Sequence, residues 1–246
     1  MFNITVIIFL AVILGIGAFT AFFDQAVIVR RGTIYRIGGT EKLVALTFDD
    51  GPSAEWTPKI LDALARANIK ATFFMIGEHI EQYPEVARRV AGEGHDIGNH
   101  TYDHHVLVYY TMEELEQELS KNELLIKEVT GGVSNRYFRP PKAWLTPGEK
   151  KKLKELGYRI ILWTLNSKDW VSFDYRYTVK YLTRKAKPGD IILFHDGGAV
   201  FSSEGGDRSA TVKVIPLLAE RLKEKGYRFV TISELLERQK INAQKQ

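Results

Sequence analysis

The sequence predicts an α/β fold, a distorted (β/α) barrel of about seven βα units preceded by one transmembrane helix. Three observations support this. From Leu43 onward, apolar runs of strand length alternate with amphipathic stretches of helix length, as in a parallel sheet covered by helices. Residues with chemically active side chains follow the predicted strands, where a βα barrel gathers such residues at one rim. An uncharged N-terminal run predicts the additional helix.

The N-terminal run from Phe2 to Phe23, FNITVIIFLAVILGIGAFTAFF, contains 22 residues without a charge. A helix that crosses a bilayer needs about 20 such residues. We therefore expect a retained single-span anchor, or an uncleaved signal, over residues 1–24. A cleaved signal peptide is the main alternative, and a buried soluble helix is another. The run lacks the basic start and the small-residue cleavage site of a signal peptide.

The remaining chain divides into an expected linker (25–40), the barrel domain (41–238) and a polar tail (239–246). Arg30 and Arg31 follow the apolar run, and the positive-inside rule alone would place them in the cytoplasm. That rule is weak for a single helix followed by a large domain. The side of the membrane on which the domain lies must therefore be inferred from function.

Within the barrel domain, strands are expected at short apolar runs and helices at the amphipathic stretches between them. The expected strands are residues 43–48, 71–76, 95–97, 137–139, 159–164, 191–194 and 228–231. The expected helices are residues 56–67, 83–91, 111–129, 147–156, 175–186, 212–225 and 233–239. The helix at 111–129 opens on TMEE, a capping-box pattern, and several of these helices end just before a glycine.

The composition limits the chemistry that the chain can perform. The chain has 246 residues and a formal net charge of +4, and it contains no cysteine. Disulfides and thiolate chemistry are therefore excluded, and a metal site must use His, Asp or Glu. No block of Lys and Arg suggests a nucleic-acid surface.

The stretch LVALTFDDGP places Asp49 and Asp50 side by side at the end of an apolar strand. Two buried like charges repel each other, so a metal ion, a cationic partner or a shared proton is needed to stabilise them. The stretch GNHTYDHH supplies His100 and His104, four residues apart, and also His105. The spacing of four is common for two zinc ligands when the segment is helical or tightly turned, and it favours His104 over His105.

Three further stretches carry polar residues after predicted strands: YFRPPK with Arg139, SKDW with Asp169 and Trp170, and ILFHDGG with His195. Each stretch taken alone also fits a surface turn or a core residue at a strand end. Their order along the chain is what makes them informative.

Together, TFDDGP, HTYDH, RPP, DW and LFH resemble the five-motif signature of polysaccharide deacetylases with a NodB homology domain (carbohydrate esterase family 4). The motifs span Thr47 to His195. The resemblance implies that the domain at 41–238 is a NodB homology domain with a distorted (β/α) barrel fold. It also implies one divalent metal ion, usually zinc, with cobalt, manganese or nickel as alternatives.

The resemblance further implies a role for each matched residue. Asp50, His100 and His104 would be the metal ligands, Asp49 the general base, and His195 the general acid. Asp169 would orient His195, and Arg139 would pair with Asp49. The backbone N–H of Lys142, after Pro140 and Pro141, would stabilise an oxyanion, and Trp170 and Leu193 would line a pocket for the acetyl methyl group.

Two positions depart from the family pattern. Lys142 stands where the family usually has an aromatic residue, which puts a cationic side chain in the groove and leaves the backbone N–H in place. Asn166 stands where the family commonly has Asp. Neither departure removes a residue with an implied catalytic role.

The expected function is therefore the hydrolysis of N-acetyl groups on amino sugars of a cell-wall polysaccharide, with peptidoglycan as the leading substrate. Chitooligosaccharide deacetylation, O-acetyl ester hydrolysis and noncatalytic glycan binding by a relic are the alternatives. The expected partners are an N-acetylated glycan and, through the N-terminal helix, a membrane. We expect no nucleic-acid partner, a monomer, and a single-pass membrane protein with an extracytoplasmic catalytic domain. The residues do not distinguish N-acetylglucosamine from N-acetylmuramic acid as the sugar that loses its acetyl group.

Overall fold

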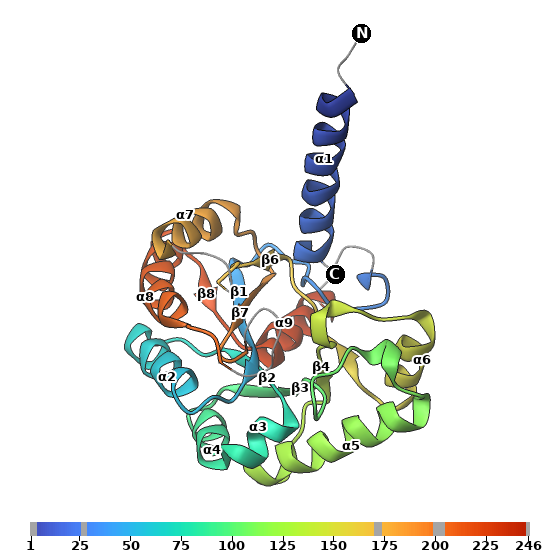
Figure 1. Cartoon of the computed structure of the whole chain (residues 1–246). Helices are drawn as coiled ribbons and strands as arrows, with labels where there is room; N and C mark the ends of the chain where they lie inside the picture. Colours follow the sequence, from blue (N-terminus) through green and yellow to red (C-terminus); the bar gives the residue numbers. More distant parts are fainter. Residues whose placement is uncertain (1–3, 26–28, 170–173, 199–204, 245–246) are drawn as a thin grey trace.

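The computed structural model describes residues 4–25, 29–169, 174–198 and 205–244. Within these residues, eight parallel strands form one sheet, which curls at the centre of the domain (Figure 1). The strands are β1 (Leu43–Gly51), β2 (Thr72–Met75), β3 (Asp96–Asn99), β4 (Tyr137–Phe138), β5 (Arg159–Ile160), β6 (Leu165–Asn166), β7 (Asp190–His195) and β8 (Arg228–Phe229).

Helices surround this sheet. The α-helices are α1 (Ile4–Gln25), α2 (Trp56–Ala67), α3 (Gly77–Gln82), α4 (Pro84–Gly92), α5 (Met112–Val129), α6 (Pro147–Glu155), α7 (Tyr175–Lys185), α8 (Ser209–Glu224) and α9 (Ile232–Gln244), and two 3-10 turns are η2 (Leu107–Tyr109) and η3 (Pro141–Ala143). Capping boxes at Thr111 and Thr146 begin α5 and α6. The alternation predicted from the sequence is therefore confirmed as an α/β fold.

The sheet is an incomplete barrel. Its strands run in the order β5-β4-β3-β2-β1-β7-β6, and β8 pairs with the start of β1. The two edge strands, β5 and β6, are consecutive in the chain, so the segment between them crosses the open side. Residues from the expected linker also reach this opening, because Ile34 bridges Ile161 and Arg36 bridges Asp190.

The strand predicted at 159–164 is wrong beyond Ile160, because β5 ends there and the next strand, β6, begins only at Leu165 and has a different partner. β5 pairs with β4, and β6 pairs with β7 on the other edge of the sheet. Between the two strands, the backbone hydrogen bonds pass from one edge of the sheet to the other. The N–H of Ile161 still donates to the carbonyl of Phe138, whereas the N–H of Thr164 donates to the carbonyl of Ile191. A continuous apolar run does not reveal where a strand loses its neighbour, so the prediction made the first strand too long and missed β6.

Other differences from the sequence prediction include two boundaries and one additional helix. β1 continues through both aspartates to Gly51, α3 is an additional short helix before α4, and α9 extends to Gln244. Helix α3 escaped prediction because a single polar turn, GEHIEQ, has too few residues to show a helical period. Pro84 then begins α4 at a position where proline suits a helix.

Apolar side chains are buried on both faces of the sheet, and successive side chains of β1 illustrate this by pointing alternately to one face and the other. Val44, Leu46 and Phe48 pack in the cluster between the sheet and the outer helices. Leu43 and Ala45 point the other way, into the barrel interior, where α9 contributes Leu235 and other residues. This two-sided burial is typical of parallel sheets, and it fixes the strand ends that carry the site.

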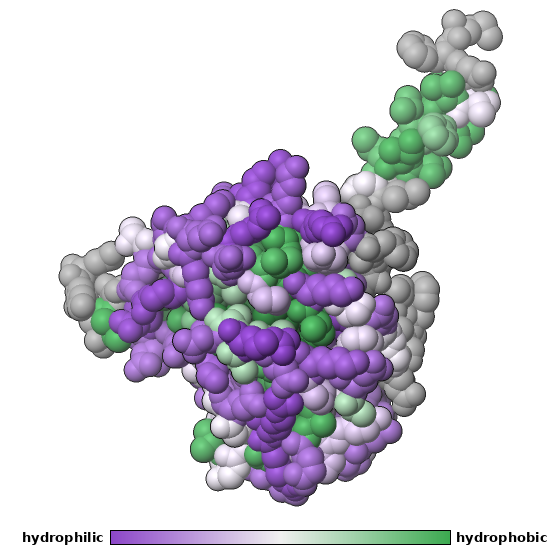
Figure 2. All heavy atoms as spheres, turned by 90° about the vertical axis from the view of Figure 1, so that its left-hand side faces the viewer, coloured by the Kyte–Doolittle hydropathy of each residue, from purple (hydrophilic) through white to green (hydrophobic). Residues whose placement is uncertain are grey.

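Helix α1 projects from the domain (Figure 1), and its side chains from Ile4 to Leu14 include many exposed apolar groups. Figure 2 shows this apolar helix beside a domain face that is mostly hydrophilic. Among the residues that the structure describes, however, no helix combines the length and the apolarity that a membrane crossing requires. The membrane anchor predicted from the sequence therefore stays a prediction.

Candidate active site

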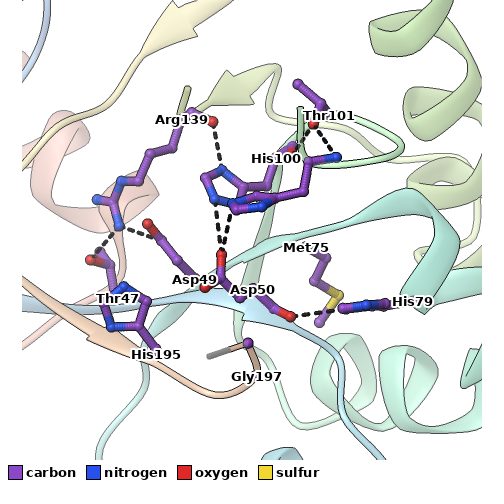
Figure 3. A network of polar contacts seen from close by, with 12 residues as sticks. Thr47, Asp49, Asp50, Met75, His79, His100, Thr101, Arg139, His195 and Gly197 are labelled. Atoms are coloured by element: carbon purple, nitrogen blue, oxygen red, sulfur yellow. Dashed lines mark hydrogen bonds and ion pairs between the residues drawn. The ribbon is translucent and has the colours of Figure 1, made fainter. Parts of the chain in front are cut away.

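The two adjacent aspartates lie at the carboxyl end of β1, where the strand is irregular. Asp50 has a φ of 72°, in the left-handed region, and the register with β2 shifts between Asp49 and Gly51. Neighbouring side chains of a regular strand point to opposite faces, and a bulge changes that alternation. The irregularity lets each carboxylate turn toward a different set of partners at the same rim (Figure 3).

Asp50 faces two histidines. Its Oδ1 atom lies 3.1 Å from Nε2 of His104 and 3.3 Å from Nε2 of His100. One ligand atom from each of the three residues falls within 4.8 Å of the others. Two imidazoles and a carboxylate form a donor set suited to zinc and related divalent ions, and three protein ligands leave a position for water or substrate. The residues present therefore fit the divalent metal that the sequence predicts.

The surroundings of Asp50 favour its ionised form. Burial acts to raise the pKa of this carboxyl, but the charge of His104 and hydrogen bonds from both histidines outweigh burial and hold the pKa well below its usual range. Asp50 is therefore ionised, as a metal-binding carboxylate must be.

The two histidines are held by a tight turn rather than a helix. Thr101 and His104 have φ values of 65° and 63°. The hydroxyl of Thr101 accepts a hydrogen bond from the His104 N–H (3.0 Å) and donates to the His100 carbonyl (2.6 Å). His100 also places Nδ1 2.6 Å from the Arg139 carbonyl, which leaves Nε2 directed at Asp50. His105 lies outside the cluster, with its exposed ring against Asp103.

Asp49 faces a different partner, the guanidinium of Arg139. Nη1 of Arg139 donates to Asp49 Oδ1 at 2.7 Å and to the Thr47 hydroxyl at 2.8 Å. Its other nitrogens donate to the carbonyls of Ile161 (3.1 Å) and Leu162 (3.3 Å). Arg139 is fully buried, and burial lowers the pKa of its guanidinium while Asp49 opposes that effect. An arginine keeps its charge under such conditions, so Asp49 has a permanent cationic partner.

His195, at the end of β7, faces Asp169, three residues after β6. Nδ1 of His195 lies 2.9 Å from Asp169 Oδ1, and the His195 backbone N–H donates to Asp169 Oδ2 at 2.8 Å. Burial alone would lower the pKa of this imidazole, but Asp169, and then Asp50 and Asp49, outweigh burial and raise the pKa to about 9. His195 therefore carries a proton at neutral pH.

The structure describes three of the residues expected to contact substrate. Pro141 and Lys142 lie in η3, directly after Arg139, and Lys142 has an exposed side chain and a φ of 53°. Leu193 is buried on β7 within the barrel interior. Trp170 lies outside the described residues. Asn166 accepts a hydrogen bond from the Lys168 N–H (2.8 Å) through its amide oxygen, a role that an Asp oxygen would also serve.

Sequence reasoning missed the hydroxyl groups that orient the charged pairs. Thr47 contacts Arg139, whereas Ser167 and Thr211 donate to Asp169 at 2.9 and 2.8 Å. Serine and threonine are too common for any of these positions to stand out in one sequence. Only the position of Thr47, two residues before Asp49, offered a signal.

Comparisons with known proteins agree with this geometry. The family model described as Polysaccharide deacetylase matches residues 36–161. A peptidoglycan-N-acetylglucosamine deacetylase of Bacillus cereus is 38% identical over 204 residues, which cover 82% of this chain and 92% of that protein.

Solved structures of similar proteins extend the likeness to the fold. A peptidoglycan N-acetylglucosamine deacetylase in complex with 4-naphthalen-1-yl-N-oxidanyl-benzamide superposes with a TM-score of 0.77 at 34% identity, covering 83% of this chain and 92% of that chain. BA3943, a CE4 family pseudoenzyme of Bacillus anthracis, gives a TM-score of 0.74 at 28% identity, covering 83% of this chain and 68% of that chain. From the family match, the relatives and the shared barrel, we conclude that this chain belongs to the polysaccharide deacetylase family.

Proposed function

We propose that this protein is a metal-dependent hydrolase that removes N-acetyl groups from amino sugars of a cell-wall polysaccharide, and that its substrate is peptidoglycan. The observation that carries the proposal is the meeting of three units at one barrel rim: the Asp49–Arg139 pair, the Asp50–His100–His104 cluster and the Asp169–His195 pair. Similar proteins are named peptidoglycan N-acetylglucosamine deacetylases, which supports the choice of substrate.

Asp50, His100 and His104 would hold the divalent ion, for which zinc is our choice. When bound there, such an ion polarises a carbonyl oxygen and lowers the pKa of water to about 7. Cobalt, manganese or nickel would suit the same three donors.

In the proposed reaction, Asp49 takes a proton from the water molecule that attacks the acetamide carbonyl. The ion pair with Arg139 (2.7 Å) holds the Asp49 carboxylate in position for this step. The backbone N–H of Lys142 would donate to the oxyanion that forms on the carbonyl oxygen. A donor directed at that oxygen would stabilise the transition state more than the substrate.

His195 then completes the reaction. Because its Nδ1 faces Asp169, its Nε2–H is the proton available to the leaving nitrogen. Protonation of that nitrogen lets the C–N bond break, and the products are acetate and a free amino sugar. Proton transfers of this kind contribute about 10²–10⁴-fold in rate each.

A noncatalytic glycan-binding relic is the alternative that the pseudoenzyme relative makes concrete. The fold by itself does not decide between the two readings. In this chain, each of the seven charged or metal-binding residues with an implied role is present and paired, namely Asp49, Asp50, His100, His104, Arg139, Asp169 and His195. That complete set favours catalysis.

We also propose, from the sequence, that the N-terminal run from Phe2 to Phe23 anchors the domain at the outer face of a cell membrane. The support is the uncharged run from Phe2 to Phe23 and the exposed apolar side chains of the described part of α1. A peptidoglycan substrate requires the domain to face the wall, which sets the orientation.

Acetate release tests the function. The full chain, supplied with zinc, is incubated with purified peptidoglycan, and Asp49→Asn serves as the control because it keeps the shape of the side chain and removes the base. We expect acetate from the unaltered chain and at least about 100-fold less from the control. Release only from chitin oligosaccharides, or only from O-acetylated xylan, would replace the substrate. No release from any of them, with zinc bound, would favour the relic.

A further inference from the structure

A buried guanidinium lies behind the proposed site. Arg208 precedes α8 as its N-cap residue, and it is only 3% exposed. Within the described residues, no carboxylate forms an ion pair with Arg208, and neighbouring Asp207 instead accepts hydrogen bonds from the N–H and hydroxyl of Ser209 (2.7 and 3.0 Å). A buried cation without an ion-pair partner is costly, and the N-terminus of a helix is its positive end. The position therefore calls for an explanation.

The partners of Arg208 are carbonyl groups of the turn that follows β7. Its Nε and Nη2 donate to the carbonyl of Gly197 at 3.0 and 2.8 Å, and Nη2 also donates to that of Gly198 at 2.5 Å. A guanidinium presents several N–H groups in one plane, so it can fix two successive carbonyls at once. The ammonium of a lysine lacks this planar arrangement.

The turn held by Arg208 packs directly against the proposed metal ligand Asp50. A Cβ atom at Gly197 would lie 2.2 Å from the Asp50 carbonyl oxygen, and one at Gly198 would lie 2.5 Å from Asp50 Oδ2. Figure 3 shows Gly197 beside Asp50. Glycine is required for such a close approach. The position of Asp50, whose own backbone is left-handed, therefore depends on where this turn lies.

We propose that Arg208 is a positioning residue of the site: by clamping the Gly197–Gly198 turn, it holds the carboxylate of Asp50 in place for metal binding. The proposal rests on the proposed function, because it assumes that Asp50 is a ligand. The clamp also reaches the other side of the site. The turn begins two residues after His195. In addition, Thr211, on the first turn of α8, donates a hydrogen bond to Asp169.

The charge of Arg208 adds to this arrangement. Burial acts to raise the pKa of Asp169, but His195, and with it the charge of Arg208, lowers the pKa below its usual value. The guanidinium thus supports the ionised Asp169 across the turn without forming an ion pair with it.

The test compares Arg208→Met and Arg208→Lys with a matched control, Arg221→Met, which removes an exposed arginine from the same helix. For each full-length variant, the zinc dissociation constant is measured by competition with a chelator, and kcat and KM are measured by acetate release. In Arg208→Met we expect zinc affinity and kcat to fall about 10–100-fold, as for residues that orient ligands from behind, with KM nearly unchanged. Arg208→Lys should fall between Arg208→Met and the unaltered chain, and the control should match the unaltered chain.

Each outcome decides for or against the clamp. Zinc affinity and kcat within about twofold of the unaltered chain in a folded Arg208→Met, or in Arg208→Lys if only that variant folds, would overturn it. If both variants failed to fold while Arg221→Met folded, Arg208 would be assigned to stability alone. If the unaltered chain released no acetate, the proposed function would fail, but the zinc comparison would still test the clamp separately.

Discussion

The two ion pairs at the barrel rim are built alike and are expected to work in opposite directions. In the Asp49–Arg139 pair, a permanent cation holds a carboxylate that is expected to accept a proton. In the Asp169–His195 pair, a carboxylate holds a cation that is expected to give one up. The side chain with the expected reactive role is the more exposed member of each pair: 6% for Asp49 against 0% for Arg139, and 15% for His195 against 1% for Asp169.

The difference teaches how one fold can hold a base and an acid at the same pH. The supporting charge lies deeper, where Arg139 donates several hydrogen bonds to the surrounding protein and Asp169 accepts several from it. Only the reactive member faces the rim, where substrate and solvent arrive. Pairs of titratable groups with divergent environments are the pattern expected of an acid and a base in one site.

The largest expected effect comes from removing the permanent cation. Arg139→Met leaves Asp49 buried beside an apolar side chain and removes four donors to buried oxygens. Breaking a buried pair by deleting one partner costs about 3–5 kcal/mol. We expect a drop of that size in the free energy of unfolding, measured by urea denaturation, together with loss of acetate release.

Arg139→Lys is the control for this prediction, because it keeps the charge and loses the planar donor arrangement. It should recover part of the stability and less of the activity. An Arg139→Met variant as stable as the unaltered chain would show that the supporting charge is dispensable, and the comparison between the two pairs would fail.

Removing the reactive member of the second pair should act chiefly on rate, and it also removes the stability that this pair contributes at neutral pH. His195→Asn removes the proton donor while keeping a side chain that can contact Asp169. We expect kcat to fall about 10²–10⁴-fold, with zinc affinity unchanged, because His195 is outside the ligand cluster. Steady-state kinetics and chelator competition check both statements. A His195→Asn variant with normal kcat would remove the acid from the proposed mechanism.

The stability that the Asp169–His195 pair contributes should depend on pH in a defined direction. The folded-state pKa of His195, about 9, lies above the value near 6.5 of an unfolded histidine. The stability from this pair is therefore fully present below about pH 6.5, and it is lost as pH rises through about 9. In the metal-free chain, Asp169→Asn should be destabilised at pH 6, and the difference from the unaltered chain should shrink by pH 10. Urea titrations at several pH values measure this, and a constant difference would contradict the pairing.

Much of this site could be predicted from one sequence because its residues follow strand ends. Asp49, Asp50 and His100 come directly at or after β1 and β3, and a parallel sheet brings such positions to one edge. His104 needed only a short spacing to be placed with them. The five separated motifs then identified the family, and the fold followed from it.

Other features depend on partners that are distant in the chain, and a single sequence does not show them. Between β5 and β6 the chain changes its hydrogen-bond partner from Phe138 to Ile191, two residues that lie far apart in the sequence. Arg208 looks like an ordinary surface arginine in the sequence GGDRS, and only the packing of the turn on Asp50 gives it a role. Hydroxyl groups such as Thr211 are equally inconspicuous until the fold places them.

The smallest expected effects come from the hydroxyls behind each pair, and they sharpen the comparison most. Thr47→Val removes one acceptor from Arg139, which keeps Asp49 and two carbonyls, so we expect a loss of stability of about 1 kcal/mol and little change in kcat. Thr211→Val removes a donor (2.8 Å) from Asp169, on which the orientation of His195 depends, so kcat should fall by about 2–10-fold. Thermal melts and kinetics on both variants measure the contrast. A larger loss of kcat in Thr47→Val than in Thr211→Val would mean that the permanent cation, despite its many partners, is the less firmly held of the two supporting charges.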